Sequence, residues 1–187
     1  MTQPAAAHPR FARALDALGL GEVEVRAFPE ATRTAAEAAA AIGCELEQIV
    51  KSLVFEADGS PVLVLMDGGS RVDVARVSEV LGGAEVRRAT AKTVREATGY
   101  AIGGVPPFGH ATTMRVLADR GLLAHHTVWA AAGTPHAVFP LDPQALIAHA
   151  GGTLAEVREG AADEGIRRAA PALRRAPAAG TSGAGER

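Results

Sequence analysis

The segment Leu53-Val54-Phe55-Glu56-Ala57-Asp58-Gly59-Ser60-Pro61-Val62-Leu63-Val64-Leu65-Met66 decides the fold of this chain. Apolar residues fill both of its ends, and the stretch between them is rich in residues that favour turns. Two apolar segments joined in this way predict a β-hairpin. The rest of the chain can be assigned outward from it.

Helix and strand signals alternate irregularly on both sides of this hairpin. The patterns predict helices near residues 11–18, 34–43, 73–81, 90–97 and 142–150. They predict strands or extended segments near 22–27, 84–86, 100–102 and 114–118, and a second hairpin over 127–131 and 136–139. This mixture favours a compact α+β domain with a mixed or mainly antiparallel sheet and flanking helices, over a doubly wound parallel sheet.

Length and composition indicate one globular domain with a tail. The chain has 187 residues, of which 48% are hydrophobic and 21% charged. No apolar run approaches the roughly 18 residues that a membrane helix needs, and no secretory signal is apparent, so we expect a cytoplasmic protein. Residues 160–187 are rich in Ala, Gly and Arg, and we expect a mostly disordered tail, with a helical stretch near 166–175 as an alternative.

The usual signatures of enzymes and metal sites are missing from the sequence. It contains no nucleophile elbow, P-loop, zinc-protease motif or dinucleotide fingerprint. The best set of histidines is His125, His126 and His136, but adjacent strand residues face opposite sides, so we expect no metal and no cofactor. Cys44 is the single cysteine, which rules out an internal disulfide, and it suits a small buried residue better than a nucleophile.

Two other features could carry chemistry. Lys51 lies at the entry to the first apolar strand, where it is either functional or an edge-strand lysine reaching for solvent. The loop from Gly103 to His110 holds three glycines and two prolines, and it is either a structural turn or a ligand-binding loop. Glycines let backbone N–H groups approach a ligand closely, and prolines hold such groups in place.

Taken together and in order, these segments resemble a known family. They are Lys51-Ser52-Leu53-Val54-Phe55, then Ala97-Thr98-Gly99-Tyr100-Ala101-Ile102-Gly103-Gly104-Val105-Pro106-Pro107-Phe108-Gly109, then Phe139-Pro140-Leu141-Asp142-Pro143-Gln144-Ala145-Leu146. The resemblance is to the YbaK/EbsC family, the stand-alone relatives of the editing domain inserted in bacterial prolyl-tRNA synthetases. It covers about residues 10–157 and implies a compact α+β domain around a curved mixed sheet.

The resemblance also implies an activity and a site. Members of the family are aminoacyl-tRNA deacylases, in which Lys51 would match the functional lysine and Gly103, Gly104 and Pro106 the glycine–proline loop. An aminoacyl ester is already activated, so its hydrolysis needs positioning and oxyanion stabilisation more than a strong protein nucleophile, and either water or a group of the substrate itself would attack. We therefore expect Lys51, Gly103 and Gly104 to be catalytic. We expect substrate to be bound by Ser52, Pro106, Tyr100 and His136, although His136 alternatively only begins a strand.

The resemblance further implies the substrate and the partners. The expected substrate is the 3′-terminal adenosine of a tRNA, expected to be tRNA for proline, that carries a small wrong amino acid such as Cys, Ser, Thr or Ala. Alanine is less favoured, because the His-Pro-Leu-x-Asn segment of the alanine-specific branch is missing. Prolyl-tRNA synthetase is a candidate partner in trans.

The charge of the chain bears on how tRNA could bind. The formal net charge is −2, so contact with tRNA phosphates must use a local patch. The candidates for that patch are Arg71, Arg76, Arg87 and Arg88, with ordinary solvated charge as the alternative. The rival function is a non-catalytic ligand- or nucleic-acid-binding module of the same fold.

Overall fold

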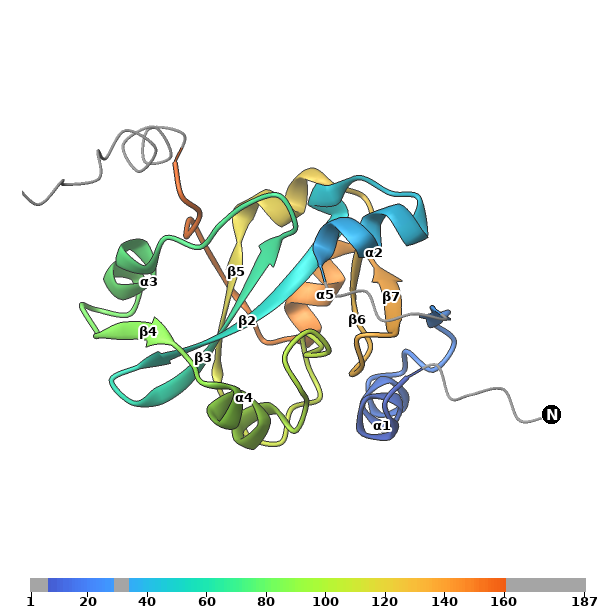
Figure 1. The fold of residues 1–187 in the computed structure, drawn as a ribbon, viewed down its shortest axis with the longest axis horizontal. Helices are drawn as coiled ribbons and strands as arrows, with labels where there is room; N and C mark the ends of the chain where they lie inside the picture. The colour runs from blue at the N-terminus through green and yellow to red at the C-terminus, as the bar shows by residue number, and fades with distance from the viewer. Residues whose placement is uncertain (1–6, 29–33, 161–187) are drawn as a thin grey trace, which may run out of the picture.

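The structure is a computed structural model and describes residues 7–28 and 34–160. Within these residues one sheet has helices on both faces (Figure 1). The strands are β1 (Arg26–Ala27), β2 (Ile49–Ala57), β3 (Ser60–Asp67), β4 (Val86–Arg88), β5 (Arg115–Asp119), β6 (Val128–Ala131), β7 (Ala137–Leu141) and β8 (Thr153–Ala155). The helices are α1 (Pro9–Ala17), α2 (Ala35–Ile42), α3 (Val74–Val80), α4 (Ala91–Thr98) and α5 (Pro143–His149), with 3₁₀ turns η1 (Leu46–Gln48) and η2 (Arg120–Ala124).

The sheet is mixed, as expected, and confirms the α+β class. Its strand order is β1-β7-β6-β2-β3-β5-β8, with β4 paired to β2 outside this path. The strand β2 runs antiparallel to β3 and β4 but parallel to β6, and β3, β5 and β8 are parallel neighbours. The long ribbon of β2 crosses the centre of the molecule from α2 toward β4 (Figure 1).

The predicted central hairpin is confirmed, with longer strands and a tighter turn than the apolar pattern indicates. Ala57 pairs with Ser60, so the turn consists of Asp58 and Gly59 alone. Both turn residues have positive φ, at 48° and 80°, as the hairpin turns that match strand twist require. Asp-Gly is among the pairs that adopt this conformation most readily.

Side chains alternate across the sheet and divide the core in two. Val50 and Val54 of β2 join the larger core, which also takes apolar residues from α1, α4 and α5. Phe55 faces the other way, toward α3, and Ile49 packs with α2. Alternate residues of a strand therefore reach different layers of the molecule.

Local end signals place the helices as predicted. The Thr34 side chain accepts a hydrogen bond from the Glu37 N–H, and the Glu37 carboxylate accepts one from the Thr34 N–H, which completes a capping box. The helix α2 ends at Gly43, whose φ of 81° suits a glycine.

Several short elements differ from the sequence expectations. The alternating segment 22–27 forms only the two-residue β1, which is exposed and pairs with β7 alone. Residues 100–102 do not form a strand, because the Gly104 N–H donates to Ala101 O and closes a turn. The short strand expected at 84–86 lies at 86–88, and β8 was not expected. In these short elements tertiary pairing decides the structure, and a pattern has too few residues to show.

The boundaries of the domain and of the tail stay predictions. The expected tail over 160–187 and its alternative helix near 166–175 lie, except for residue 160, outside the described residues. Among the residues that are described, no helix has the length and apolar character needed to cross a membrane.

Candidate active site

A gap in the sheet beside β2 forms the candidate site. On the edge away from β3, β2 pairs with β6 at Ile49 and Val50 and with β4 from Phe55 to Ala57. Residues 51–54 have no strand beside them on that edge, and there the Val54 carbonyl accepts a hydrogen bond from the Ala89 N–H at 3.2 Å. A cavity of about 380 Å³ occupies this gap.

The cavity is lined from both faces of the sheet. On one face α2 contributes Ala35 and Ala38, and on the other the loop after α4 contributes Gly103 and Val105. Most of the remaining walls are apolar side chains, many of them from β2, β6 and β7, and they include the large ring of Trp129. Such a cavity lies at the small end of ligand sites, which span about 300–1,000 Å³.

Lys51 and Ser52 both line the cavity and reach it from different faces. Alternation along β2 places Lys51 on the face that carries Ile49 and Phe55, and Ser52 on the face of Val50. Ser52 Oγ is buried and has no hydrogen-bond partner among the described residues. A buried hydroxyl without a partner is uncommon, and this one belongs to a residue that lines the cavity.

The Lys51 ammonium is held by main-chain carbonyls. Its Nζ donates to Gly68 O at 3.2 Å and to Ser70 O, both in the turn that follows β3. An ammonium group has three N–H donors, so these two bonds leave one for a substrate. The backbone of this turn thus fixes the ammonium of a residue that also lines the cavity.

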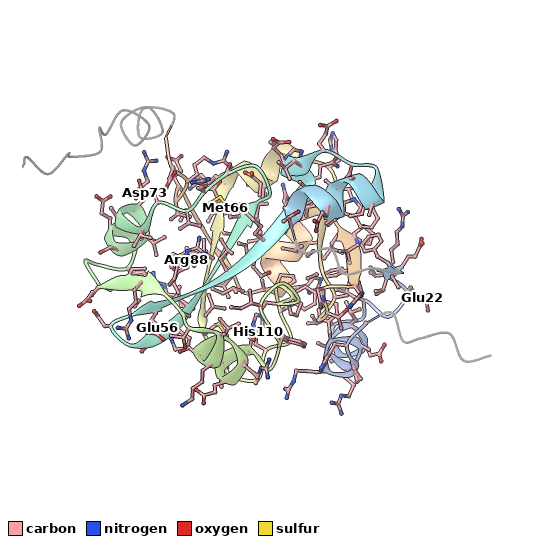
Figure 2. The ribbon with its side chains drawn as sticks, viewed as in Figure 1. Glu22, Glu56, Met66, Asp73, Arg88 and His110 are labelled. Carbon is pink, nitrogen blue, oxygen red and sulfur yellow. The ribbon has the colours of Figure 1, made fainter. Side chains whose placement is uncertain are left out.

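The surroundings of Lys51 lower the pKa of its ammonium. Burial is the largest cause, and the nearby cations Arg71 and Arg88 lower the pKa further, whereas Asp67 opposes them. Arg88, which Figure 2 labels, belongs to β4. It also lines the cavity. The site is therefore electropositive on a chain whose formal net charge is −2.

The two predicted oxyanion glycines differ in their surroundings. Gly103 lines the cavity with a φ of 88°, and its N–H has no acceptor among the described residues. The Gly104 N–H already donates to Ala101 O at 3.0 Å. A Cβ on Gly104 would lie 2.9 Å from Thr134 Cα, so this glycine lets the loop pack against the β6–β7 turn.

Pro106 and Tyr100 support the loop and do not line the cavity. The Pro106 carbonyl accepts a hydrogen bond from His110 Nε2 at 2.7 Å, and burial lowers the pKa of the His110 imidazole. Figure 2 shows His110 beside this loop. The Tyr100 side chain is buried, and its hydroxyl donates to Gly109 O at 2.8 Å. Burial raises the Tyr100 pKa to about 12.

His136 is exposed and is not part of the cavity wall. Its N–H donates to Thr134 Oγ1 at 3.3 Å, and its carbonyl accepts from the Phe28 N–H at 2.7 Å. Its neighbours Pro135 and Ala137 do line the cavity. The structure thus brings Lys51, Ser52 and Gly103 together, and it places the other predicted residues behind or beside them.

Sequence reasoning missed two parts of the site. The first is the wall from α2, which becomes a neighbour of β2 only in the folded chain. The second is Ile102 at the rim, 64% exposed and the most exposed large apolar side chain among the described residues. An isoleucine beside glycines in a loop was the signal that could have indicated the rim.

The candidates for other chemistry do not form a second site. No group of three or more His, Cys, Asp or Glu side chains that could hold a metal occurs in residues 7–28 and 34–160. Cys44 is partly buried against the cluster of Ile49 and Trp129, and burial raises the pKa of its thiol. A thiol with a raised pKa is a poor nucleophile.

Comparison with known proteins assigns the family. The model of the aminoacyl-tRNA editing domain matches residues 29–148, and the chain belongs to this family. An uncharacterised protein of Bacillus subtilis (strain 168), YwhH, is 34% identical over 125 residues, which are 67% of this chain and 80% of that protein. A proline–tRNA ligase of Maridesulfovibrio salexigens is 34% identical over 90 residues, 48% of this chain but only 15% of the ligase.

Solved structures agree in fold and in sequence. A protein described as a putative trans-editing enzyme for prolyl tRNA synthetase superposes with a TM-score of 0.79 at 44% identity, covering 86% of this chain and all of that one. The hypothetical protein APE2540 gives a TM-score of 0.74 at 33% identity, covering 80% of this chain and 99% of that one. Fold and family together make this chain an editing domain, whose substrate class is aminoacyl-tRNA.

Proposed function

We propose that this protein is a stand-alone deacylase that hydrolyses a small, wrongly attached amino acid from tRNA, with tRNA for proline as the first candidate. The observation that carries the proposal is that Lys51, Ser52 and Gly103 line one and the same cavity. The similarity to proline–tRNA ligases and to a protein described as a trans-editing enzyme supports the choice of tRNA. Such an enzyme works in the cytoplasm, where tRNA is charged.

The mechanism needs positioning more than a protein nucleophile. In the proposal the ester carbonyl oxygen accepts a hydrogen bond from the Gly103 N–H. The third N–H of the Lys51 ammonium donates a hydrogen bond to an oxygen of the ester or of the terminal ribose. Water attacks the carbonyl carbon, the carbon–oxygen ester bond breaks, and the ribose oxygen leaves with a proton. Free amino acid and uncharged tRNA are the products. Donors fixed before the reaction stabilise the developing oxyanion without reorganising.

The size of the cavity supports a small amino acid. About 380 Å³ must hold the acyl group and part of the terminal nucleoside. A large acyl side chain would compete with the nucleoside for this limited volume, whereas a small one leaves room for it. Discrimination among small side chains is worth only about 1–3 kcal/mol per methylene, so several small esters are expected to react.

A deacylation panel tests the function. Ala, Cys, Ser and Thr esters of tRNA for proline and of tRNA for alanine are incubated with the protein, with the correctly charged tRNAs alongside. We expect one or more mischarged esters to be hydrolysed and the correct prolyl ester to be spared. Binding of tRNA without hydrolysis of any ester would instead establish a binding module.

Replacing Lys51 tests the site. We expect Lys51→Ala to lower kcat by about 10²–10³-fold, the loss found when one oxyanion donor is removed, and to leave the fold intact. The matched control is Lys92→Ala, since Lys92 is the other lysine and lies exposed on α4, where it pairs with Glu96 at 3.8 Å. Equal turnover by Lys51→Ala and the wild type would remove Lys51 from the mechanism.

A further inference from the structure

Arg158 joins two buried carboxylates from different strands. Its Nε donates to Asp119 Oδ1 at 2.8 Å, its Nη2 donates to the same oxygen, and Nη2 also donates to Asp67 Oδ2 at 2.9 Å. The Asp67 and Asp119 side chains are 3% and 1% exposed. Hydrogen bonding to Asp119 and the charges of both carboxylates raise the pKa of the guanidinium. Buried carboxylates of this kind need a paired cation.

The fold leaves space for this side chain. A Cβ on Gly121 would overlap Arg158 Nη2, so the glycine leaves room for the guanidinium in this position. The Gly121 N–H and the Val157 N–H donate to the two oxygens of Asp119 at 2.9 and 3.1 Å. Arg158 is thus seated among fixed groups on both sides, and its position is determined by the fold.

Asp67 carries the effect of Arg158 into the turn that follows β3. Besides Arg158, it accepts hydrogen bonds from the Ser70 N–H at 2.7 Å and from the Ser70 hydroxyl at 2.9 Å. Gly68 in the same turn has no room for a Cβ, which would overlap the Leu46 carbonyl. The turn is therefore held by the hydrogen bonds between Asp67 and Ser70, by the contact of Asp67 with Arg158, and by the close packing of Gly68 on the Leu46 carbonyl.

This turn supplies the two carbonyls that hold Lys51. Gly68 O and Ser70 O are the acceptors of the Lys51 ammonium, and they flank Gly69 in the segment that Asp67 closes. A continuous series of contacts thus runs from Arg158 through Asp67 and the turn to Lys51. Arg158 itself does not line the cavity.

We propose that Arg158 is a positioning residue for deacylation, which holds the turn 67–70 so that its carbonyls orient the Lys51 ammonium in the cavity. This inference rests on the proposed function of the site. Arg158 lies outside the residues 29–148 that the family model matches. Because it acts through Lys51 and does not touch substrate, its loss lowers kcat and leaves KM nearly unchanged.

Kinetics of Arg158→Met test the inference. We expect kcat to fall about tenfold or more, since a misplacement near 1 Å can cost 10²-fold. The control is Val157→Ala, in the same segment: it removes buried packing but keeps every polar contact of the series, so we expect a lower Tm with kcat retained. A loss of Tm equal to that of Val157→Ala, with kcat unchanged, would make Arg158 purely structural and overturn the proposal.

A double variant tests whether the effect passes through Lys51. We expect Lys51→Ala with Arg158→Met to be no slower than Lys51→Ala alone, because coupled residues are not additive. Independent, additive losses would contradict the proposed route. Should Arg158→Met fail to fold, Arg158→Lys keeps a cation beside both carboxylates. A lysine ammonium cannot reproduce the several fixed N–H donors of the Arg158 guanidinium. We therefore expect Arg158→Lys to fold with a kcat between those of the wild type and of Lys51→Ala.

Nuclear magnetic resonance gives a readout independent of activity. The chain has two lysines, Lys51 and Lys92, so lysine-selective labelling yields two signals. We expect Arg158→Met to shift the Lys51 signal and its titration and to leave Lys92 unchanged, while Val157→Ala changes neither. An unmoved Lys51 signal would overturn the positioning role even if deacylation were confirmed. If the Lys51 signal shifts but the protein hydrolyses no ester, the proposed deacylase function is overturned, while the contact between Arg158 and the Lys51 site stands.

Discussion

Lys51 and Ser52 are neighbours on β2 and approach the cavity from opposite faces. A strand normally separates such residues by the thickness of the sheet, and here they share a cavity because residues 51–54 lack a strand beside them. Two adjacent residues of one strand, one charged and one polar, thus line the same cavity. Neither needs to leave its place in the strand.

The pKa of Lys51 predicts the alkaline limb of activity. Burial lowers this pKa below its ordinary value of 10.5, and the reaction as proposed needs the protonated ammonium. Activity relative to spontaneous ester hydrolysis should therefore fall as pH rises through the lowered pKa. The check is kcat/KM measured from neutral to alkaline pH, and a limb at or above 10.5 would contradict it.

The lowered pKa of Lys51 also makes the stability of the fold depend on pH, in the direction opposite to activity. The unfolded chain binds the Lys51 proton more tightly, so this lysine disfavours folding at neutral pH. That cost fades as pH rises from the lowered pKa to 10.5. Activity and the stability contribution of this one group thus move in opposite directions.

Single residues of the site could be predicted from sequence only in part. Lys51 and Gly103 were indicated by a lysine before an apolar strand and by a glycine–proline loop. The use of the Gly104 N–H inside a turn was not, because the acceptor Ala101 O depends on the loop's conformation. The unpaired Ser52 Oγ was equally invisible, since pairing depends on distant neighbours.

Among the elements, β4 carries two arginines with different surroundings. Arg87 bonds to the buried Glu56 through Nε at 2.7 Å and Nη2 at 2.6 Å. Arg88 lies at the cavity wall with its guanidinium 5.8 Å from the ring of Phe55. Arg87 is thus bound to a carboxylate of the protein, whereas the adjacent Arg88 lies at the proposed tRNA site.

This difference predicts opposite effects of two substitutions. We expect Arg88→Ala to raise KM for charged tRNA and to lower the slope of affinity against salt by about one, as for a lost phosphate contact. We expect Arg87→Ala to lower the Tm instead, because it leaves the Glu56 carboxylate without its cation. Salt titrations of tRNA binding test Arg88→Ala, and thermal unfolding tests Arg87→Ala. A loss of tRNA affinity in Arg87→Ala together with a loss of Tm in Arg88→Ala would contradict both assignments.

Elements with strong local signals were predicted well, and short ones were not. The hairpin of β2 and β3 and the capped α2 are determined by residues close in sequence. The strands β1 and β8, of two and three residues, exist through pairing with β7 and β5. The gap beside β2 is a property of where β4 and β6 end, which no local pattern contains.

For the whole molecule, the segment after β8 connects distant parts of the chain. The Val157 carbonyl accepts from the Asp73 N–H at 2.8 Å, and the Glu159 N–H donates to Arg71 O at 2.9 Å. The Val157 side chain is fully buried. These contacts hold the start of α3 to the edge of the sheet.

Two truncations test this connection. A chain ending at Gly160 keeps the hydrogen bonds of Val157 and Glu159 given above and the buried Val157 side chain, and it is the reference. A chain ending at Ala155 leaves the buried carboxylates of Asp67 and Asp119 unpaired and should lose about 3 kcal/mol or more of stability. The Tm values of the two truncated chains are compared by thermal unfolding. Equal values would show that residues 156–160 do not contribute to stability.

The interruption along β2 has a consequence for what the protein can admit. An open strand edge invites another polypeptide to add as a further strand, the usual route to unwanted association. Here the unpaired stretch stops at β6 on one side and at β4 on the other, so an incoming strand finds no length to extend along. A lone acyl group needs no such length. This gap can therefore offer strand backbone to a small ligand and stay closed to an added strand.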